Sequence, residues 1–184
     1  MKTTIFFTLL AALMMLFNGL AFSADDKPVG VWLFDKDNKD VAKDVSEVGN
    51  DGKIQGGVKW TKDGKFGGAL EFDGVDGWVE VPDHKSLQFP KGTDFTLACW
   101  IQITTPEPSP PMLVAKTYHP AEVRPWYALY YADQSKNATG DVSLFLRDAG
   151  GNSFHIAAGT KIDDDKWHHV VGTREKDKII LYVD

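Results

Sequence analysis

The chain contains almost no cysteine, since Cys99 is the only one among 184 residues. A lone cysteine excludes a disulfide within the chain and leaves a free thiol. Cys99 alternates with the apolar side chains of Phe95, Leu97, Ile101 and Ile103. This pattern favours a small buried hydrophobe over a reactive nucleophile.

Basic charge is also scarce, with 20 Lys and Arg against 26 Asp and Glu, which gives a formal net charge of −6. A surface of this sign repels polyanions. The composition therefore argues against nucleic acid or an anionic membrane as the main partner.

Long hydrophobic runs are absent apart from Ile5 to Phe17, which follows Lys2. That run is shorter than the roughly 20 apolar residues that span a bilayer. Small residues at Ala21 and Ser23 fit the last positions before a signal-peptidase site. We predict a signal peptide over residues 1–23, with no membrane insertion after cleavage. The destination would be extracellular, the cell surface or the periplasm.

Removal of 23 of the 184 residues leaves 161, and loss of Lys2 leaves 19 basic against 26 acidic residues, a net charge of −7. A chain of that length is enough for one domain with a full apolar core. We predict that residues 24–184 form this domain.

No segment has convincing helical periodicity, whereas short alternating segments separated by turn residues recur along the chain. The pattern predicts an all-β fold, an antiparallel two-sheet sandwich or jelly roll, with 95–103 as a central strand. The predicted strands are 29–34, 54–55, 58–60, 69–72, 78–81, 95–103, 112–117, 126–132, 141–147, 153–158, 167–174 and 178–183.

The segments 69–72 and 78–81 flank the turn-forming residues Asp73 to Gly77. Two short apolar segments around such a turn are typical of a β-hairpin. Alternation places Leu70 and Phe72 on the apolar face of this predicted hairpin. A second sheet is needed to cover that face.

Several motifs together resemble the LamG-like jelly-roll domains of the concanavalin A-like lectin/glucanase superfamily, of the type found in secreted bacterial proteins. They are VGVWLFD, GNDGKIQGG, the predicted hairpin, DFTLACWIQI, DKWHHVVGT and IILYVD, in that order. The resemblance covers nearly all of the predicted mature chain and implies a jelly roll.

Members of that family usually continue past the VD pair into a glycine turn and further strands. This chain stops at Asp184, directly after a segment that is apolar on both faces. Such a segment needs cover. We therefore expect a C-terminally truncated domain, with further domains beyond it in the full-length protein.

The carboxylates Glu71, Asp73 and Asp76 superficially resemble the acidic strand of retaining endoglucanases with this fold. A retaining pair must stand roughly 5 Å apart on one strand face. Here Asp76 is one methylene shorter and is placed in a turn by Gly74 and Gly77. We therefore predict no catalytic residue and interpret these carboxylates as solvated.

His168 and His169 are neighbours on a predicted strand. Adjacent strand side chains point to opposite faces, so the two rings cannot easily bind one metal ion. We interpret both as structural.

Calcium is a more plausible cofactor, because Asp and Asn in glycine-rich loops supply the oxygens that it needs. The candidates are Asp44, Asn50 and Asp51 in the first long loop, and Asp73 and Asp76 in the predicted turn. The resemblance favours calcium, whereas the absence of a spaced loop motif favours ordinary turn-forming roles.

Aromatic residues are concentrated in one predicted strand, at Trp126, Tyr127, Tyr130 and Tyr131. Alternation must send some of these rings outward, where they could hold the apolar face of a sugar. Polar residues that could lie beside them are Asp133, Gln134, Arg147 and Asn152. We predict ligand binding by Trp126, Tyr127 and Tyr131, while the alternative for any one ring is the core.

Three functions fit the sequence. The first is a secreted, non-catalytic recognition module that binds carbohydrate or a surface or matrix protein. The second is a glycoside hydrolase or lyase that uses the acidic segment around Glu71. The third is a structural spacer domain of a larger surface protein.

Overall fold

The computed structural model describes residues 27–104, 111–117, 125–131 and 140–184. The predicted signal peptide, 1–23, lies outside these ranges. Within them the chain forms twelve strands and one short 3-10 helix, η1 (Lys85–Leu87). No helix among the described residues has the length and apolarity needed to cross a bilayer.

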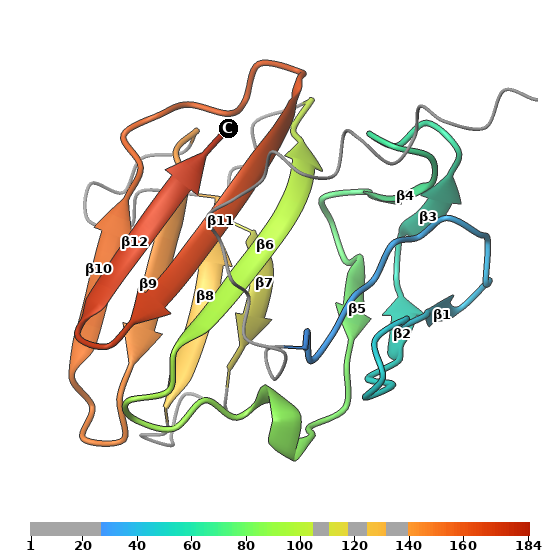
Figure 1. Cartoon of the computed structure of the whole chain (residues 1–184). Helices are drawn as coiled ribbons and strands as arrows, with labels where there is room; N and C mark the ends of the chain where they lie inside the picture. Colours follow the sequence, from blue (N-terminus) through green and yellow to red (C-terminus); the bar gives the residue numbers. More distant parts are fainter. Residues whose placement is uncertain (1–26, 105–110, 118–124, 132–139) are drawn as a thin grey trace, which may run out of the picture.

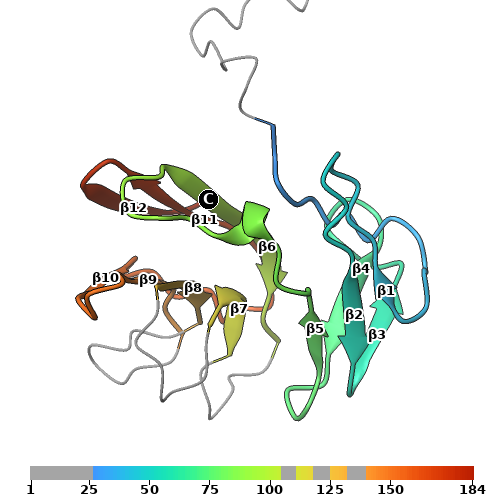
Figure 2. The ribbon, with the colours of Figure 1, turned by 90° about the horizontal axis from the view of Figure 1, so that it is seen from below.

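Two sheets face each other and form a sandwich (Figures 1 and 2). One has the order β12-β11-β6 and the other the order β10-β9-β8-β7, and every pair is antiparallel. The strands of the sandwich are β6 (Phe95–Gln102), β7 (Met112–Lys116), β8 (Trp126–Tyr130), β9 (Ser143–Arg147), β10 (Ser153–Ala157), β11 (Trp167–Glu175) and β12 (Lys178–Val183). This architecture confirms the predicted all-β antiparallel sandwich.

The core lies between these two sheets and is built by alternation. Leu97 and Val170 point inward from one sheet, and Leu129, Leu144 and Leu146 from the other. A Cβ built on Gly172 would lie 2.9 Å from Leu129 Cδ2 and 3.0 Å from Leu144 Cδ1. The sheets therefore approach each other closely at Gly172, where a side chain would not fit without repacking.

Cys99 packs against this core from the inward face of β6. Burial raises the pKa of its thiol to about 11, which keeps the sulfur protonated at neutral pH. The thiol is therefore a weak nucleophile, as the alternation of β6 predicts.

The five N-terminal strands lie beside the sandwich, on the side that carries β6 and β7 (Figures 1 and 2). They are β1 (Val41–Ala42), β2 (Gly52–Gln55), β3 (Val58–Thr61), β4 (Ala69–Phe72) and β5 (Trp78–Glu80). An ion pair between Lys116 of β7 and Asp83, which follows β5, links the two parts.

The prediction of a hairpin between 69–72 and 78–81 is wrong, because β4 pairs with β3 while β5 pairs with β2. The chain reverses between β3 and β4 instead. Residues 73–77 form a loop between β4 and β5. This 73–77 loop lies opposite Gly56 and Gly57, the two residues between β2 and β3. Phe72 is 52 % exposed, so the apolar face predicted for this segment is only partly covered.

The predicted strand 29–34 is not formed. Its backbone bonds to a loop instead, because Val31 N donates to the carboxylate of Asp44 and Val31 O accepts from Val45 N. Trp32 Nε1 donates to Asn50 O, 3.1 Å away. Side-chain and loop acceptors therefore satisfy groups that would otherwise need a neighbouring strand.

Candidate functional site

Alternation along β8 divides its aromatic residues between the two faces of the sheet. Tyr127 and Tyr131 point into the sandwich and are 9 % and 0 % exposed. Tyr127 packs against Phe89 and Phe95, and its hydroxyl donates to Leu87 O. Both rings contribute to the core, so their burial removes them from the predicted binding surface.

Trp126, the third predicted residue, lies on the opposite face of the same sheet and remains partly exposed. Its ring stacks on Phe145 of β9, with centroids 4.2 Å apart and planes inclined by 27°. Tyr130 meets both rings edge-on, at 6.3 Å from Trp126 and 6.4 Å from Phe145. We call the side of the β10-β9-β8-β7 sheet that carries Trp126, Phe145, Arg147 and His155 the outer face.

Two nitrogen-rich side chains border the aromatic group on the outer face. Arg147 lies directly across from Trp126 in the β8–β9 register, and His155 of β10 lies directly across from Phe145. Both residues are half-buried. Within the described ranges, Nε of Arg147 and Nε2 of His155 are buried without a hydrogen-bond partner.

The outer face thus combines an aromatic platform with the nitrogen-bearing side chains of Arg147 and His155 at its border. Aromatic rings offer a flat apolar surface, and a few placed polar groups orient the molecule bound there. Sequence reasoning named Trp126 and Arg147 but missed Phe145 and His155. The alternation of Ser143, Phe145 and Arg147 in β9 is the signal that could have found Phe145.

Of the other polar residues predicted beside the platform, Asn152 does not join it. Asn152 lies in the turn between β9 and β10, where its amide donates to Asp148 Oδ2 at 2.9 Å. Asp133 and Gln134 lie outside the described residues.

The first group of calcium candidates forms a hydrogen-bonded loop. The buried carboxylate of Asp44 accepts from the backbone N–H groups of Val31, Ser46 and Asn50 and from the Ser46 hydroxyl. Burial opposes ionisation of Asp44, but these hydrogen bonds outweigh it and lower the pKa. Asp51 accepts from Asp44 N and from Lys43, so this loop uses its oxygens internally.

Asn50 is held in the same way, since its amide donates to Val29 O at 2.7 Å and to Ser86 Oγ at 3.0 Å. In the described part of the chain, no group of three or more His, Cys, Asp or Glu side chains is arranged to hold a metal ion.

The second group of calcium candidates, Asp73 and Asp76, stabilises the 73–77 loop. Asp73 Oδ1 accepts from the backbone N–H groups of Val75, Asp76 and Gly77, and the first of these contributes most to lowering the pKa of Asp73. Asp76 Oδ1 accepts from Gly57 N at 2.9 Å. These carboxylates shape the backbone, while Glu71 stands exposed on β4.

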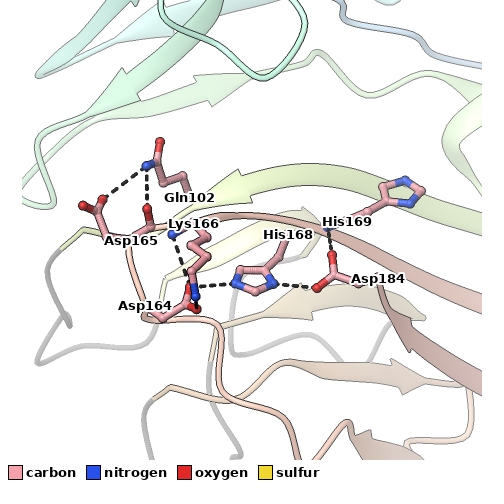
Figure 3. Close-up of polar contacts among 7 residues, drawn as sticks. All are labelled: Gln102, Asp164, Asp165, Lys166, His168, His169 and Asp184. Atoms are coloured by element: carbon pink, nitrogen blue, oxygen red, sulfur yellow. Dashed lines mark hydrogen bonds and ion pairs between the residues drawn. The ribbon is translucent and has the colours of Figure 1, made fainter.

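His168 and His169 point to opposite faces of β11, as alternation predicts (Figure 3). The His168 ring lies between two carboxylates, with Nε2 2.8 Å from Asp164 Oδ1 and Nδ1 2.7 Å from Asp184 Oδ2. The hydrogen bond with Asp164 is the largest cause of the raised pKa of His168. His169 instead stacks on Trp100, at 4.9 Å between ring centroids. His168 thus ties β11 to the loop before it and to the residue after β12.

Comparison with known proteins agrees with this fold. A family model described as the concanavalin A-like lectin/glucanases superfamily matches residues 73–184, which is more than half of the chain and includes the whole sandwich. No curated protein matches the sequence. The sandwich and the family match together place the chain in the concanavalin A-like lectin/glucanase superfamily.

Proposed function

We propose that this protein is a secreted, non-catalytic recognition module that binds carbohydrate on the outer face of the β10-β9-β8-β7 sheet. The observation that carries the proposal is the Trp126–Phe145 stack, bordered by Arg147 and His155. Domains of this superfamily often bind carbohydrate, which is consistent with such a role.

The physical basis is the fit between aromatic rings and a pyranose. A sugar has an apolar face formed by C–H groups and a rim of hydroxyls. The apolar face can pack on Trp126 and Phe145, while the hydroxyl rim lies toward the polar residues at the border of the platform. Both rings are already half-buried, so the area that they can still lose to a ligand is modest. We expect a dissociation constant in roughly the micromolar to millimolar range.

The absence of turnover is part of the proposal. Glu71, Asp73 and Asp76 are all exposed, but Asp73 and Asp76 are engaged by backbone N–H groups. A retaining glycosidase needs two carboxyl groups, one as nucleophile and one as acid. We expect no release of reducing sugar from any polysaccharide that binds. Activity that Glu71→Gln abolishes would favour the hydrolase instead.

The place of action follows from the predicted signal peptide. An apolar run after Lys2, with small residues before the expected cut, is the pattern that directs export. We propose that the mature chain acts outside the cytoplasm, where polysaccharides and surface proteins are available. Mass spectrometry of the exported protein tests this, with a new N-terminus at Ala24 as the expected result.

Isothermal titration of the full chain against a panel of soluble polysaccharides tests the binding function. Trp126→Ala should weaken binding about tenfold or more, since an aromatic contact and its buried area are lost. Trp78→Ala is the matched control, because Trp78 is 50 % exposed on β5, outside the sandwich. Binding lost equally in both variants would contradict the assigned face. If no polysaccharide binds, carbohydrate recognition is refuted, and binding of a protein partner becomes the favoured function.

A further inference from the structure

The sandwich has an unprotected edge at β12. No strand in the described part of the chain pairs with the free side of β12, which ends the β12-β11-β6 sheet (Figure 1). The register between β11 and β12 runs without a bulge, whereas β7, at the edge of the other sheet, has an irregularity between Met112 and Val114. Edge strands are usually protected from further pairing by bulges, prolines or charges. β12 contains no proline and only one charged residue, Lys178.

The hydrogen bonds at the end of β12 identify which of its backbone groups are free. Asp184 N donates to His169 O at 3.0 Å, so residue 184 directs its backbone groups toward β11. In an antiparallel ladder this direction alternates from one residue to the next. The even-numbered residues of β12 therefore bond to β11, and the free N–H and C=O groups belong to Ile179, Leu181 and Val183.

We propose that this edge binds the same edge of a second copy of the chain, so that two β12 strands pair antiparallel about a two-fold axis. One symmetric register uses every residue with free backbone groups. It places Leu181 opposite Leu181 of the second copy and Ile179 opposite Val183. A register centred one residue earlier or later would place one of these residues opposite a position outside β12.

The side chains of β12 fit this register on both faces. Ile179, Leu181 and Val183 pack against the core, so Ile180 and Tyr182 lie on the opposite side of the sheet. In the paired strands, Tyr182 lies opposite Ile180 of the second copy. Tyr182 is 52 % exposed in the single chain, and a pair between an aromatic and a β-branched side chain stabilises adjacent strands.

Charge complementarity favours a second copy over an unrelated strand. The same register places the exposed Lys178 opposite Asp184 of the second copy, and the two-fold axis forms this pair twice. The Asp184 carboxylate accepts from His169 N and lies 2.7 Å from His168 Nδ1, yet its side chain is 54 % exposed. A carboxylate has about four acceptor positions, so Asp184 can also accept from an ammonium group.

Apolar surface is exposed at the same side of the sandwich on the other sheet. This sheet ends at β10, which lies on the side of the sandwich that carries β12 (Figures 1 and 2). Phe154 of β10 lies opposite Leu146 and so faces the interior, but it is 52 % exposed. Pairing at β12 brings the β10 edges of the two copies toward each other, where Phe154 can lose this exposed area.

Sedimentation velocity of the full chain over a concentration series tests the association. We expect a reversible dimer with a dissociation constant of roughly micromolar order. Lys178→Glu should weaken the dimer about fivefold to tenfold, because it replaces two attractive pairs with two repulsive ones. Lys85→Glu makes the same change of charge on η1, away from β12, and is the matched control (Figure 1).

Disulfide cross-linking tests the register. Opposite residues of a non-hydrogen-bonded pair have Cα atoms about 4.5 Å apart, within the range of a disulfide. An oxidised mixture of the Ile180→Cys and Tyr182→Cys variants should therefore give a 180–182 link between chains, identified by mass spectrometry. Cys99 is present in every variant, so the wild-type chain oxidised in the same way is the control. Thermal melts verify that each variant is folded.

The outcomes do not depend on carbohydrate binding. A wild-type chain that stays monomeric at every concentration would overturn the proposal. So would a dimer in which Lys178→Glu behaves like Lys85→Glu and the mixed cysteine variants form no 180–182 link, because association would then use another surface. A concentration-dependent dimer with that link supports the paired β12 edges, and the two readouts at different positions keep the test decisive if one variant does not fold.

Discussion

The His168 cluster should make the stability of the domain depend on pH in a definite direction. The ring is 12 % exposed and lies between Asp164 and Asp184. Its pKa is raised above 6.5, first by the hydrogen bond with Asp164. A group with a raised pKa in the folded state binds its proton more tightly there than in the unfolded chain. Its contribution is therefore fully present below about pH 6.5 and is lost as the pH rises through the folded pKa.

The size of this stabilisation depends on how exposed the two carboxylates beside His168 are. The side chains of Asp164 and Asp184 are 41 % and 54 % exposed, so water and salt screen both ion pairs. For His168 we expect a stabilisation of about 1 kcal/mol when the ring is protonated, which is the upper end for exposed pairs. The pKa of Asp164 is lowered to about 2, first by Lys166 and then by His168. Asp164 also stabilises the fold, but its pH dependence is opposite: its contribution is present above about pH 4 and is lost as the pH falls toward the folded pKa.

The assay is urea unfolding of the wild-type chain and His168→Gln at pH 5.5, 7 and 9. The difference in the free energy of unfolding should be about 1 kcal/mol at pH 5.5 and should shrink toward pH 9. Asp164→Asn should reduce the pH dependence, because it removes the first cause of the shift. His155→Gln, on the opposite sheet, is the control. A difference that stays constant or grows with pH would refute the reasoning.

Three further changes test the packing and the loops. Gly172→Ala should destabilise the fold by about 1–3 kcal/mol in urea unfolding, because the added methyl group meets Leu129 across the sandwich. Gly57→Ala would place a Cβ 1.7 Å from Asp73 Oδ2, and we expect it to destabilise the fold by about 1–2 kcal/mol. The destabilisation should be smaller in a chain that already carries Asp73→Ala, and a double-mutant cycle measures this difference. Asp44→Ala should cost about 2 kcal/mol or more, because three backbone N–H groups lose their acceptor. This loss should shrink as the pH falls below about 4, the pKa of Asp in the unfolded chain, toward the lowered pKa of Asp44 in the folded chain.

The sandwich strands could be predicted from the sequence because their alternation is strong. The segment predicted at 95–103 forms β6 over Phe95–Gln102, and the segment predicted at 178–183 matches β12 fully. In each of these strands one face is buried against the opposite sheet, so local pattern and tertiary packing favour the same structure.

The N-terminal part could not be predicted in the same way, because turn chemistry alone does not say whether a chain reverses. Asp73 to Gly77 has the composition of a hairpin turn, yet the chain resumes its direction after it. The deciding contacts are long-range ones from Gly57, whose N–H donates to Asp76 and whose carbonyl oxygen accepts from Asp73 N. Such contacts are invisible to a reading of local pattern.

The candidate site could be predicted only in part, for a related reason. Alternation requires that the rings of β8 divide between two faces, but it does not say which face is the core. Burial of Leu129 decides this, and it takes Tyr127 and Tyr131 inward with it. Trp126 is left on the outer face. Its neighbours Phe145, Arg147 and His155 lie on β9 and β10, and the pairing of the strands brings them together although they are distant in sequence.

The outward aromatic rings of the two sheets make different contacts, and this difference supports the binding face that we propose. On the β12-β11-β6 sheet, Trp100 stacks on His169 and is met edge-on by Phe66, at 5.3 Å between ring centroids, while Lys65 Nζ lies 4.8 Å from its ring centroid. Phe66 and Lys65 belong to the reversal between β3 and β4, so this ring already contacts the N-terminal part of the domain. Trp126 instead contacts rings of its own sheet, Phe145 and Tyr130. We therefore propose the face of Trp126 as the binding face, because a ligand at Trp100 would first have to displace Phe66 and Lys65.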